Sequence, residues 1–310
     1  MNRKLLLNKR LMVILLALCA LMCNRTGAQA QMLGYTEPGQ TARAEAVLYF
    51  RYLDSAWLGQ EQRSIQVKKT ESIERALVQA LLDGPQDRTA FPQPLFAEGT
   101  SIINVLAERD RLFVSLSKEV MDPLPGENTG AGRQEAVLRR TLAMAALVNT
   151  LSESGNFRSI QVLVLDEPGI TKSMRLSQRY YLDDSDALPP PLTRQEQAII
   201  TPGRAASTIL ERWKAQDWSC FLEMVTPGIS SGSHHEPLKS SMLPLLIEWE
   251  VSSGSISPDG RSAVAVLNLC VQSASGQQQD VTNFPLILLN EGHGWRIRQQ
   301  SIEQILDLVK

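Results

Sequence analysis

The sequence is poor in the residues that carry most protein chemistry. Its 310 residues include only three histidines and four cysteines. It contains no compact motif that presents a nucleophile, cradles a phosphate or binds zinc through paired cysteines or histidines. We therefore assign no catalytic, cofactor-binding or metal-binding residue, and we expect no cofactor and no enzymatic activity.

The three histidines are His234, His235 and His293. His234 and His235 follow a run of serine and glycine that is typical of a loop. Adjacent side chains on an extended chain point to opposite sides, so this pair is poorly arranged to bind one metal ion. His293 lies between two glycines in a predicted turn. We interpret all three as solvated side chains.

Cysteine is scarce outside the first 30 residues, where only Cys220 and Cys270 occur. An exported pair could form a disulfide. Two reduced thiols inside a core are an equally good interpretation, because free cysteine is a common buried residue. Both alternatives stay open, and two cysteines cannot form a disulfide scaffold.

Positive charge is also scarce in most of the chain. The first 30 residues hold five of the 31 basic residues and none of the 33 acidic residues, so the rest of the chain is clearly acidic. A nucleic-acid partner requires a basic face. This charge balance therefore argues against nucleic acid as a partner.

Long apolar runs are absent except near the N-terminus. The uncharged run from Leu11 to Cys23 follows four cations and precedes the small residues of Ala28-Gln29-Ala30. The run is short for a membrane-spanning helix, which needs ~20 apolar residues. These features predict that residues 1–30 are a secretory signal peptide cleaved after Ala30, or an N-terminal anchor. Residues 31–44 would then form a tether.

Lipidation at Cys19 or Cys23 is a further alternative for the N-terminal segment. Leu18 and Met22 precede these cysteines where a small residue is expected. The protein is expected outside the cytoplasm, either secreted or anchored on the outer face of the cytoplasmic membrane.

Residues 45–180 show the alternating patterns of a small mixed domain. Period-2 patterns predict strands, and apolar stripes at spacings of three and four predict helices. The helix at residues 73–82 is followed by Gly84-Pro85, a strong stop signal. The predicted strands are 47–53, 64–68, 101–107, 112–117 and 160–165, and the predicted helices are 73–82 and 135–151.

The phrases ALVQALLDGP, FAEGTSI, LFVSLS and SIQVLVL occur in this order between residues 76 and 165. In this order they resemble a GerMN domain, over about residues 45–175. That family is found in sporulation, spore-germination and envelope lipoproteins of Gram-positive bacteria. The resemblance implies a role in assembly or protein interaction and supplies no catalytic residues. The poor lipidation signal departs from the lipoprotein members.

Residues 181–199 have the composition of a linker. An acidic cluster, Asp183 to Asp186, is followed by three prolines at 189–191. Acidic side chains are costly to bury without partners, and proline cannot donate a backbone hydrogen bond. We expect residues 183–197 to form an exposed hinge with few contacts to either core.

The sequence pattern of residues 200–310 predicts helices followed by a curved sheet. Thr201-Pro202 opens a helix, Asp217 begins a shorter one, and residues 238–247 are a third helical or irregular piece. The predicted strands are 248–253, 263–271, 284–289 and 295–298, followed by a closing helix at 301–310. The phrase ILERWKAQDWSCFLEMV and a final GWRI strand resemble nuclear transport factor 2-like (SnoaL-like) domains, in which Trp213 and Trp218 would brace the core.

The predicted fold class is therefore α+β: a GerMN-like domain with two helices on a small sheet, then a helices-then-curved-sheet domain. The expected function is that of a non-enzymatic exported envelope protein, membrane-associated through its N-terminal segment if that segment is uncleaved or lipidated. It would act in assembly or interaction during sporulation or spore germination. Its partners would be envelope or spore-assembly proteins, and a homo-oligomer is left open.

Two other functions are kept as alternatives. The first is ligand binding in an apolar pocket of the C-terminal domain. The second is a small-molecule enzyme that uses the same pocket with Asp217 or a histidine. The pocket would be lined by Trp213, Trp218, Phe221, Trp249 and Phe284.

Overall fold

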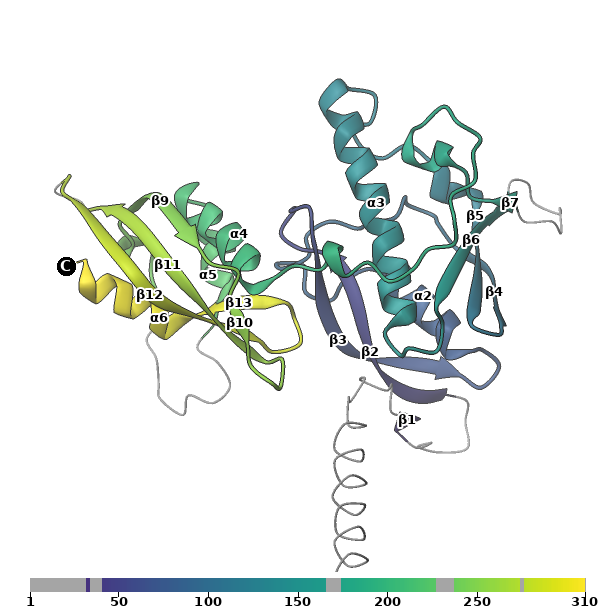
Figure 1. Cartoon of the computed structure of the whole chain (residues 1–310), viewed down its shortest axis with the longest axis horizontal. Coiled ribbons are helices and arrows are strands. Elements are labelled where there is room, and N and C mark those ends of the chain that lie inside the picture. Colours follow the sequence, from purple (N-terminus) through teal and green to yellow (C-terminus); the bar gives the residue numbers. More distant parts are fainter. Residues whose placement is uncertain (1–31, 34–40, 166–173, 227–236, 274–275, 310) are drawn as a thin grey trace, which may run out of the picture.

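The strands of the chain form three sheets that are arranged in two lobes (Figure 1). The computed structural model describes residues 32–33, 41–165, 174–226, 237–273 and 276–309. We call residues 41–198 the N-terminal lobe and residues 199–309 the C-terminal lobe. The predicted signal segment with Cys19 and Cys23, and His234 with His235, lie outside the described residues.

The first sheet has the order β1-β2-β3, with β1 at Met32–Leu33, β2 at Thr41–Arg51 and β3 at Leu58–Lys68. All pairs are antiparallel, which confirms the predicted pair of strands. The predicted tether is wrong at its C-terminal end, because β2 already begins at Thr41. Ala42 and Ala44 are buried and pair with β3, and their small side chains gave too weak an apolar signal for a strand.

The first helix, α2, spans Ile73–Leu82 as predicted, and the side chain of Ser72 caps it by accepting from the Arg75 amide. Gly84 follows with a φ of +86°, the left-handed conformation that glycine adopts without strain. The second helix, α3, spans Gly130–Ser152 and begins five residues before the predicted start. Glycine is a poor helix former, so the glycines of its first turn concealed this start.

The second sheet has the order β4-β5-β6-β7. Strands β4 and β5 correspond to the predicted strands 101–107 and 112–117 and form an antiparallel hairpin, and β5 pairs in parallel with β6. The chain passes through α3 between β5 and β6, as a parallel pair requires. The predicted strand at 160–165 is confirmed as β6, which lies between β5 and β7. The bounds are Ile102–Glu108 for β4, Arg111–Ser117 for β5, Ser159–Leu165 for β6 and Met174–Arg175 for β7.

In the C-terminal lobe, two helices precede a sheet, as predicted. The sheet has six strands where the sequence predicted four, because β8 and β10 have only two residues each. The caps are Thr201 and Asp217, whose side chains accept from the amides of Arg204 and Cys220. The predicted helical or irregular piece at 238–247 is wrong only for its last three residues, because Leu245 already begins β9. The elements are α4 Pro202–Lys214, α5 Trp218–Glu223, β8 Val225–Thr226, β9 Leu245–Val251, β10 Ser255–Ile256, β11 Ser262–Gln272, β12 Gln278–Asn290, β13 Trp295–Arg298 and α6 Gln299–Leu308.

The predicted hinge is only partly exposed. The acidic residues at 183, 184 and 186 do face solvent. After the prolines, however, the chain is held against the N-terminal lobe. Leu192 and Ile160 exchange two backbone hydrogen bonds of 2.8 Å. The Asn149 side chain donates to the Gln195 carbonyl (3.1 Å) and accepts from its amide (2.8 Å).

Arg194 strengthens this attachment by donating to Glu153 at 2.6 Å and to the Tyr49 hydroxyl at 3.0 Å. The expectation of few contacts is therefore wrong for residues 192–197. The composition of the segment predicted exposure from its acids and prolines. The residues after the prolines regain their backbone donors and satisfy groups on α3 and β6.

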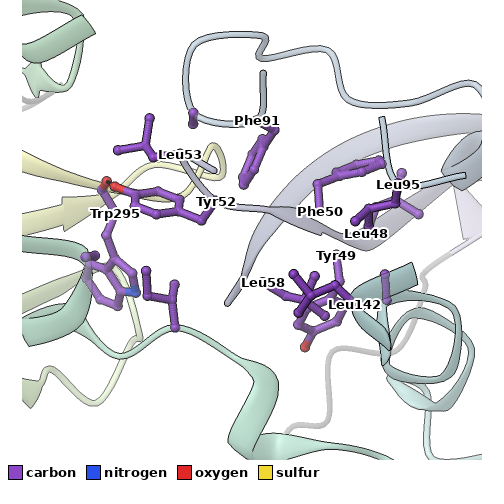
Figure 2. Close-up of a cluster of buried hydrophobic side chains, with 14 of the residues drawn as sticks. Leu48, Tyr49, Phe50, Tyr52, Leu53, Leu58, Phe91, Leu95, Leu142 and Trp295 are labelled. Carbon is purple, nitrogen blue, oxygen red and sulfur yellow. Dashed lines mark hydrogen bonds between the residues drawn. The ribbon is translucent and has the colours of Figure 1, made fainter. Parts of the chain in front are cut away.

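The two lobes meet at a packed joint centred on Tyr52, which lies between Trp295, Leu53 and Phe91 (Figure 2). Tyr52 is fully buried, and its hydroxyl donates to the Trp295 carbonyl at 2.5 Å. Gly294 lies against the same rings. A Cβ atom there would be 3.2 Å from Tyr52 and 3.3 Å from Phe91. The close approach of the lobes therefore depends on the missing side chain of Gly294.

Backbone and charged groups also cross the joint. The Gln62 amide donates to the Gly292 carbonyl at 2.7 Å, and the Ile200 amide donates to the Leu58 carbonyl at 2.8 Å. Arg296 forms an ion pair with Asp87. The buried apolar residues of both lobes form one continuous cluster. Among the helices of the described residues, none is long and apolar enough to cross a membrane.

The joint predicts one cooperative unfolding transition for the whole chain. Gly294→Ala should lower the free energy of unfolding by about 1–3 kcal/mol. The added Cβ atom would crowd the Tyr52 and Phe91 rings, and alanine is strained at the φ of +79° that Gly294 adopts. Gly126→Ala is a matched control, since Gly126 has a φ of +80° and open space around it. Thermal melts followed by fluorescence and circular dichroism check this. Two separate transitions, or equal losses in the two variants, would contradict it.

The attachment of residues 192–197 predicts a change in proteolysis. Asn149→Ala leaves the amide and carbonyl of Gln195 without partners, at a cost of about 1–3 kcal/mol. Trypsin should then cut after Arg194 markedly faster than in the unchanged chain. Asn156→Ala, at an exposed turn position, should leave the rate unchanged. Rapid cleavage after Arg194 in the unchanged chain would mean that the segment is not held.

Candidate binding groove

Across the part of the chain that the structure describes, no three potential metal ligands come together. His293 lies at the joint, where it forms an isolated antiparallel bridge with Glu61. Cys220 and Cys270 are free thiols. Burial raises the pKa of the Cys220 thiol, and a hydrogen bond to Asp280 raises that of Cys270. A raised pKa disfavours the reactive thiolate, so neither cysteine is activated for chemistry.

The aromatic residues of the C-terminal lobe mainly fill its core. Trp213 and Phe221 have no accessible surface, and their ring centroids are 5.2 Å apart. The Trp213 indole donates to the Pro244 carbonyl at 2.9 Å. These two side chains therefore line no open space, whereas Trp249 lines a space of about 410 Å³. Trp218 packs with its edge toward Phe221, also in a bracing position.

A groove of about 460 Å³ lies in the N-terminal lobe. It is formed by the end of α2, the segment 94–100, the segment 123–125 and one side chain of α3. Pro94, Pro123 and Pro125 form an exposed rim, and Leu95 and Phe96 form a buried floor. Proline rings have little freedom to move, so this rim is rigid. The other lining residues are Leu81, Leu82, Gly84, Ala97, Glu98, Gly99, Thr100, Leu124 and Arg139.

Arg139 is the one cation in the lining of this groove. Its Nε is buried without a hydrogen-bond partner, and within the described residues its side chain forms no ion pair. Burial, followed by the nearby charge of Arg51, lowers the pKa of Arg139. Glu135 lies one turn earlier on α3 and is already paired with Arg51. The groove therefore combines apolar walls with a cation that lacks a bound counter-charge.

The adjacent Arg140 behaves differently. Its guanidinium donates to the carbonyls of Tyr180 (2.9 Å) and Asp122 (3.0 Å) and to the Glu127 carboxylate (2.8 Å). It therefore ties two loops to α3. Arg140 is buried and forms an ion pair with Glu127, whereas Arg139 is half-buried and forms no ion pair within the described residues.

The contrast between the two arginines predicts different effects on stability. Arg140→Gln should lower the free energy of unfolding by about 3 kcal/mol, since it leaves the buried partners of Arg140 unpaired. Arg139→Gln should leave the free energy unchanged or raise it, because it removes a partly desolvated charge that has no partner. Urea denaturation of both variants checks this. A large loss in Arg139→Gln would show that Arg139 has a structural partner.

The match to known proteins covers the lobe that contains this groove. Residues 47–169 match the Germane family model, described as sporulation and spore germination. This is the region for which the sequence predicted a GerMN-like domain. No curated protein matches the chain.

Three solved structures are similar to parts of the chain. The tandem GerMN domains of the sporulation protein GerM from Bacillus subtilis are 14% identical, with a TM-score of 0.33, covering 55% of this chain and 51% of that chain. A putative lipoprotein from Clostridium perfringens is 17% identical (TM-score 0.26; 51% and 93% covered). The first GerMN domain of GerM is 14% identical (TM-score 0.28; 46% and 96% covered). The chain thus spans about half the length of the tandem structure.

Proposed function

We propose that this chain is a non-enzymatic exported envelope protein that acts through protein interaction in sporulation or spore germination. The observation that carries the proposal is the match of residues 47–169 to the Germane family model. It is consistent with the two unactivated thiols and with the lack of a metal-binding cluster among the described residues. A binding surface accounts for a groove with a rigid proline rim and an apolar floor.

The N-terminal segment would bring the protein to the outer face of the cytoplasmic membrane, either as a signal peptide or as an anchor. Residues 200–310 would serve as an accessory domain of the nuclear transport factor 2-like type. The helices that precede its curved sheet, with Trp213 in the core, support that proposal. The partners would be envelope or spore-assembly proteins, or a second copy of this chain.

The joint between the lobes supports an interaction role. A protein that presents surfaces to partners gains affinity when those surfaces are held in a fixed geometry before binding. The hydrogen bonds of Gln62, Ile200 and Tyr52 across the joint provide this constraint. The accessory domain would therefore be presented at a constant orientation to the GerMN-like region.

A capture experiment tests the proposed function. The full chain, purified in mild detergent, is immobilised and exposed to membrane fractions from sporulating cells of its native host. Mass spectrometry should identify envelope or sporulation proteins that are absent from a bare-resin control.

The same preparation should show no turnover of peptidoglycan or of common esters. Turnover of either substrate, or recovery of cytoplasmic metabolic enzymes alone, would overturn the proposal.

A further inference from the structure

We propose that the groove around Arg139 binds an acidic peptide segment of a partner protein, with one carboxylate on the Arg139 guanidinium. This inference rests on the proposed role in protein interaction and specifies the chemistry of the partner. The apolar residue next to that carboxylate would pack against the proline rim. The groove's volume of about 460 Å³ is that of a site for a few residues.

The first argument is the state of the Arg139 side chain. A buried polar group without a partner costs free energy, and a charged group costs more. Both arginines have a buried Nε without a partner, but Arg140 also donates three hydrogen bonds through its other guanidinium nitrogens. Within the described residues, the Arg139 guanidinium forms no hydrogen bond and no ion pair. A carboxylate accepts paired hydrogen bonds from a guanidinium in a geometry that few other groups match. Binding a carboxylate would therefore offset the free-energy cost of keeping the Arg139 guanidinium partly buried without a partner.

The second argument is the surroundings of that charge. Leu82 and the three rim prolines present apolar surface beside Arg139. Apolar walls exclude water, and a charge-assisted hydrogen bond is stronger when water is excluded. The same walls provide contact area for an aliphatic or proline side chain next to the acid. The groove therefore favours a mixed acidic and apolar segment over a free inorganic anion.

The charge in the groove also limits the ligand. Glu98 lies in the lining together with Arg139, so the groove has one cation and one anion. A polyanion such as a nucleic acid or a highly charged lipid surface would be repelled by Glu98 and by the acidic chain. A single carboxylate can contact Arg139 and stay away from Glu98. We therefore commit to a peptide with one acid at this position.

The test uses the full chain in mild detergent and a phage-displayed library of random heptapeptides, with Arg139→Gln as the counter-selection target. Enriched peptides should carry Asp or Glu next to an apolar residue. Synthetic copies should bind the unchanged chain at least about tenfold more tightly than Arg139→Gln, as expected for a lost charged hydrogen bond. Replacing the peptide acid by its amide should cause a similar loss.

Two further variants make the result specific. Leu82→Glu should also abolish binding, because it places a second acid in the wall of the groove. Arg158→Gln is the matched control, since the Arg158 side chain is 88% exposed, and it should bind like the unchanged chain. Thermal melts should show that every variant is folded.

Several results would overturn the inference. In the first, no peptide is enriched on the unchanged chain relative to Arg139→Gln. In the second, the enriched peptides carry no acidic residue. In the third, the peptides bind the unchanged chain and Arg139→Gln equally tightly. If envelope proteins are still captured from membrane fractions in any of these cases, the proposed function stands and only the groove is rejected. If capture fails as well, both proposals are rejected.

Discussion

The orientation of the two lobes depends on one tight turn between β2 and β3. Leu53 and Asp54 both have positive φ angles there, 45° and 59°. Such angles are rare and strained for residues other than glycine, so surrounding contacts must hold them. Arg212 of the C-terminal lobe donates to the Leu53 carbonyl at 2.9 Å. Arg51 donates to the Asp54 carbonyl at 2.7 Å and to the Ser55 carbonyl at 2.8 Å. Two arginines thus hold the turn, and one of them comes from the other lobe.

Local patterns predicted the elements whose partners are close in sequence. The helix at 73–82 and the strand at 295–298 were predicted within their observed bounds, because caps, glycines and alternation act over a few residues. The attachment of residues 192–197 was missed, since it depends on Asn149 of α3, more than 40 residues earlier. The joint was missed for the same reason. In sequence, Tyr52 is one more aromatic residue at the end of a strand, and its partner in Trp295 is 243 residues away.

The groove was not predictable because two adjacent arginines have the same appearance in a sequence. Successive helix positions point about 100° apart around the axis, so neighbours meet different surroundings. Arg140 meets Glu127 and two carbonyls, and Arg139 meets apolar rim residues. Only the packed loops at 94–100 and 123–125 distinguish them.

A single segment connects the joint to the groove. Residues 86–99 carry Phe91, which packs against Tyr52 at the joint (Figure 2). The same segment carries Leu95 and Phe96, which line the groove. The Ala90 carbonyl accepts from the Leu53 amide at 2.9 Å, so the start of this segment is fixed by the strained turn. The contacts that hold the lobes together therefore also hold the groove floor before any ligand arrives. Such preorganisation reduces the conformational entropy that the protein loses on binding. This raises the affinity of a small groove whose proposed ligand makes only one ion pair with the protein.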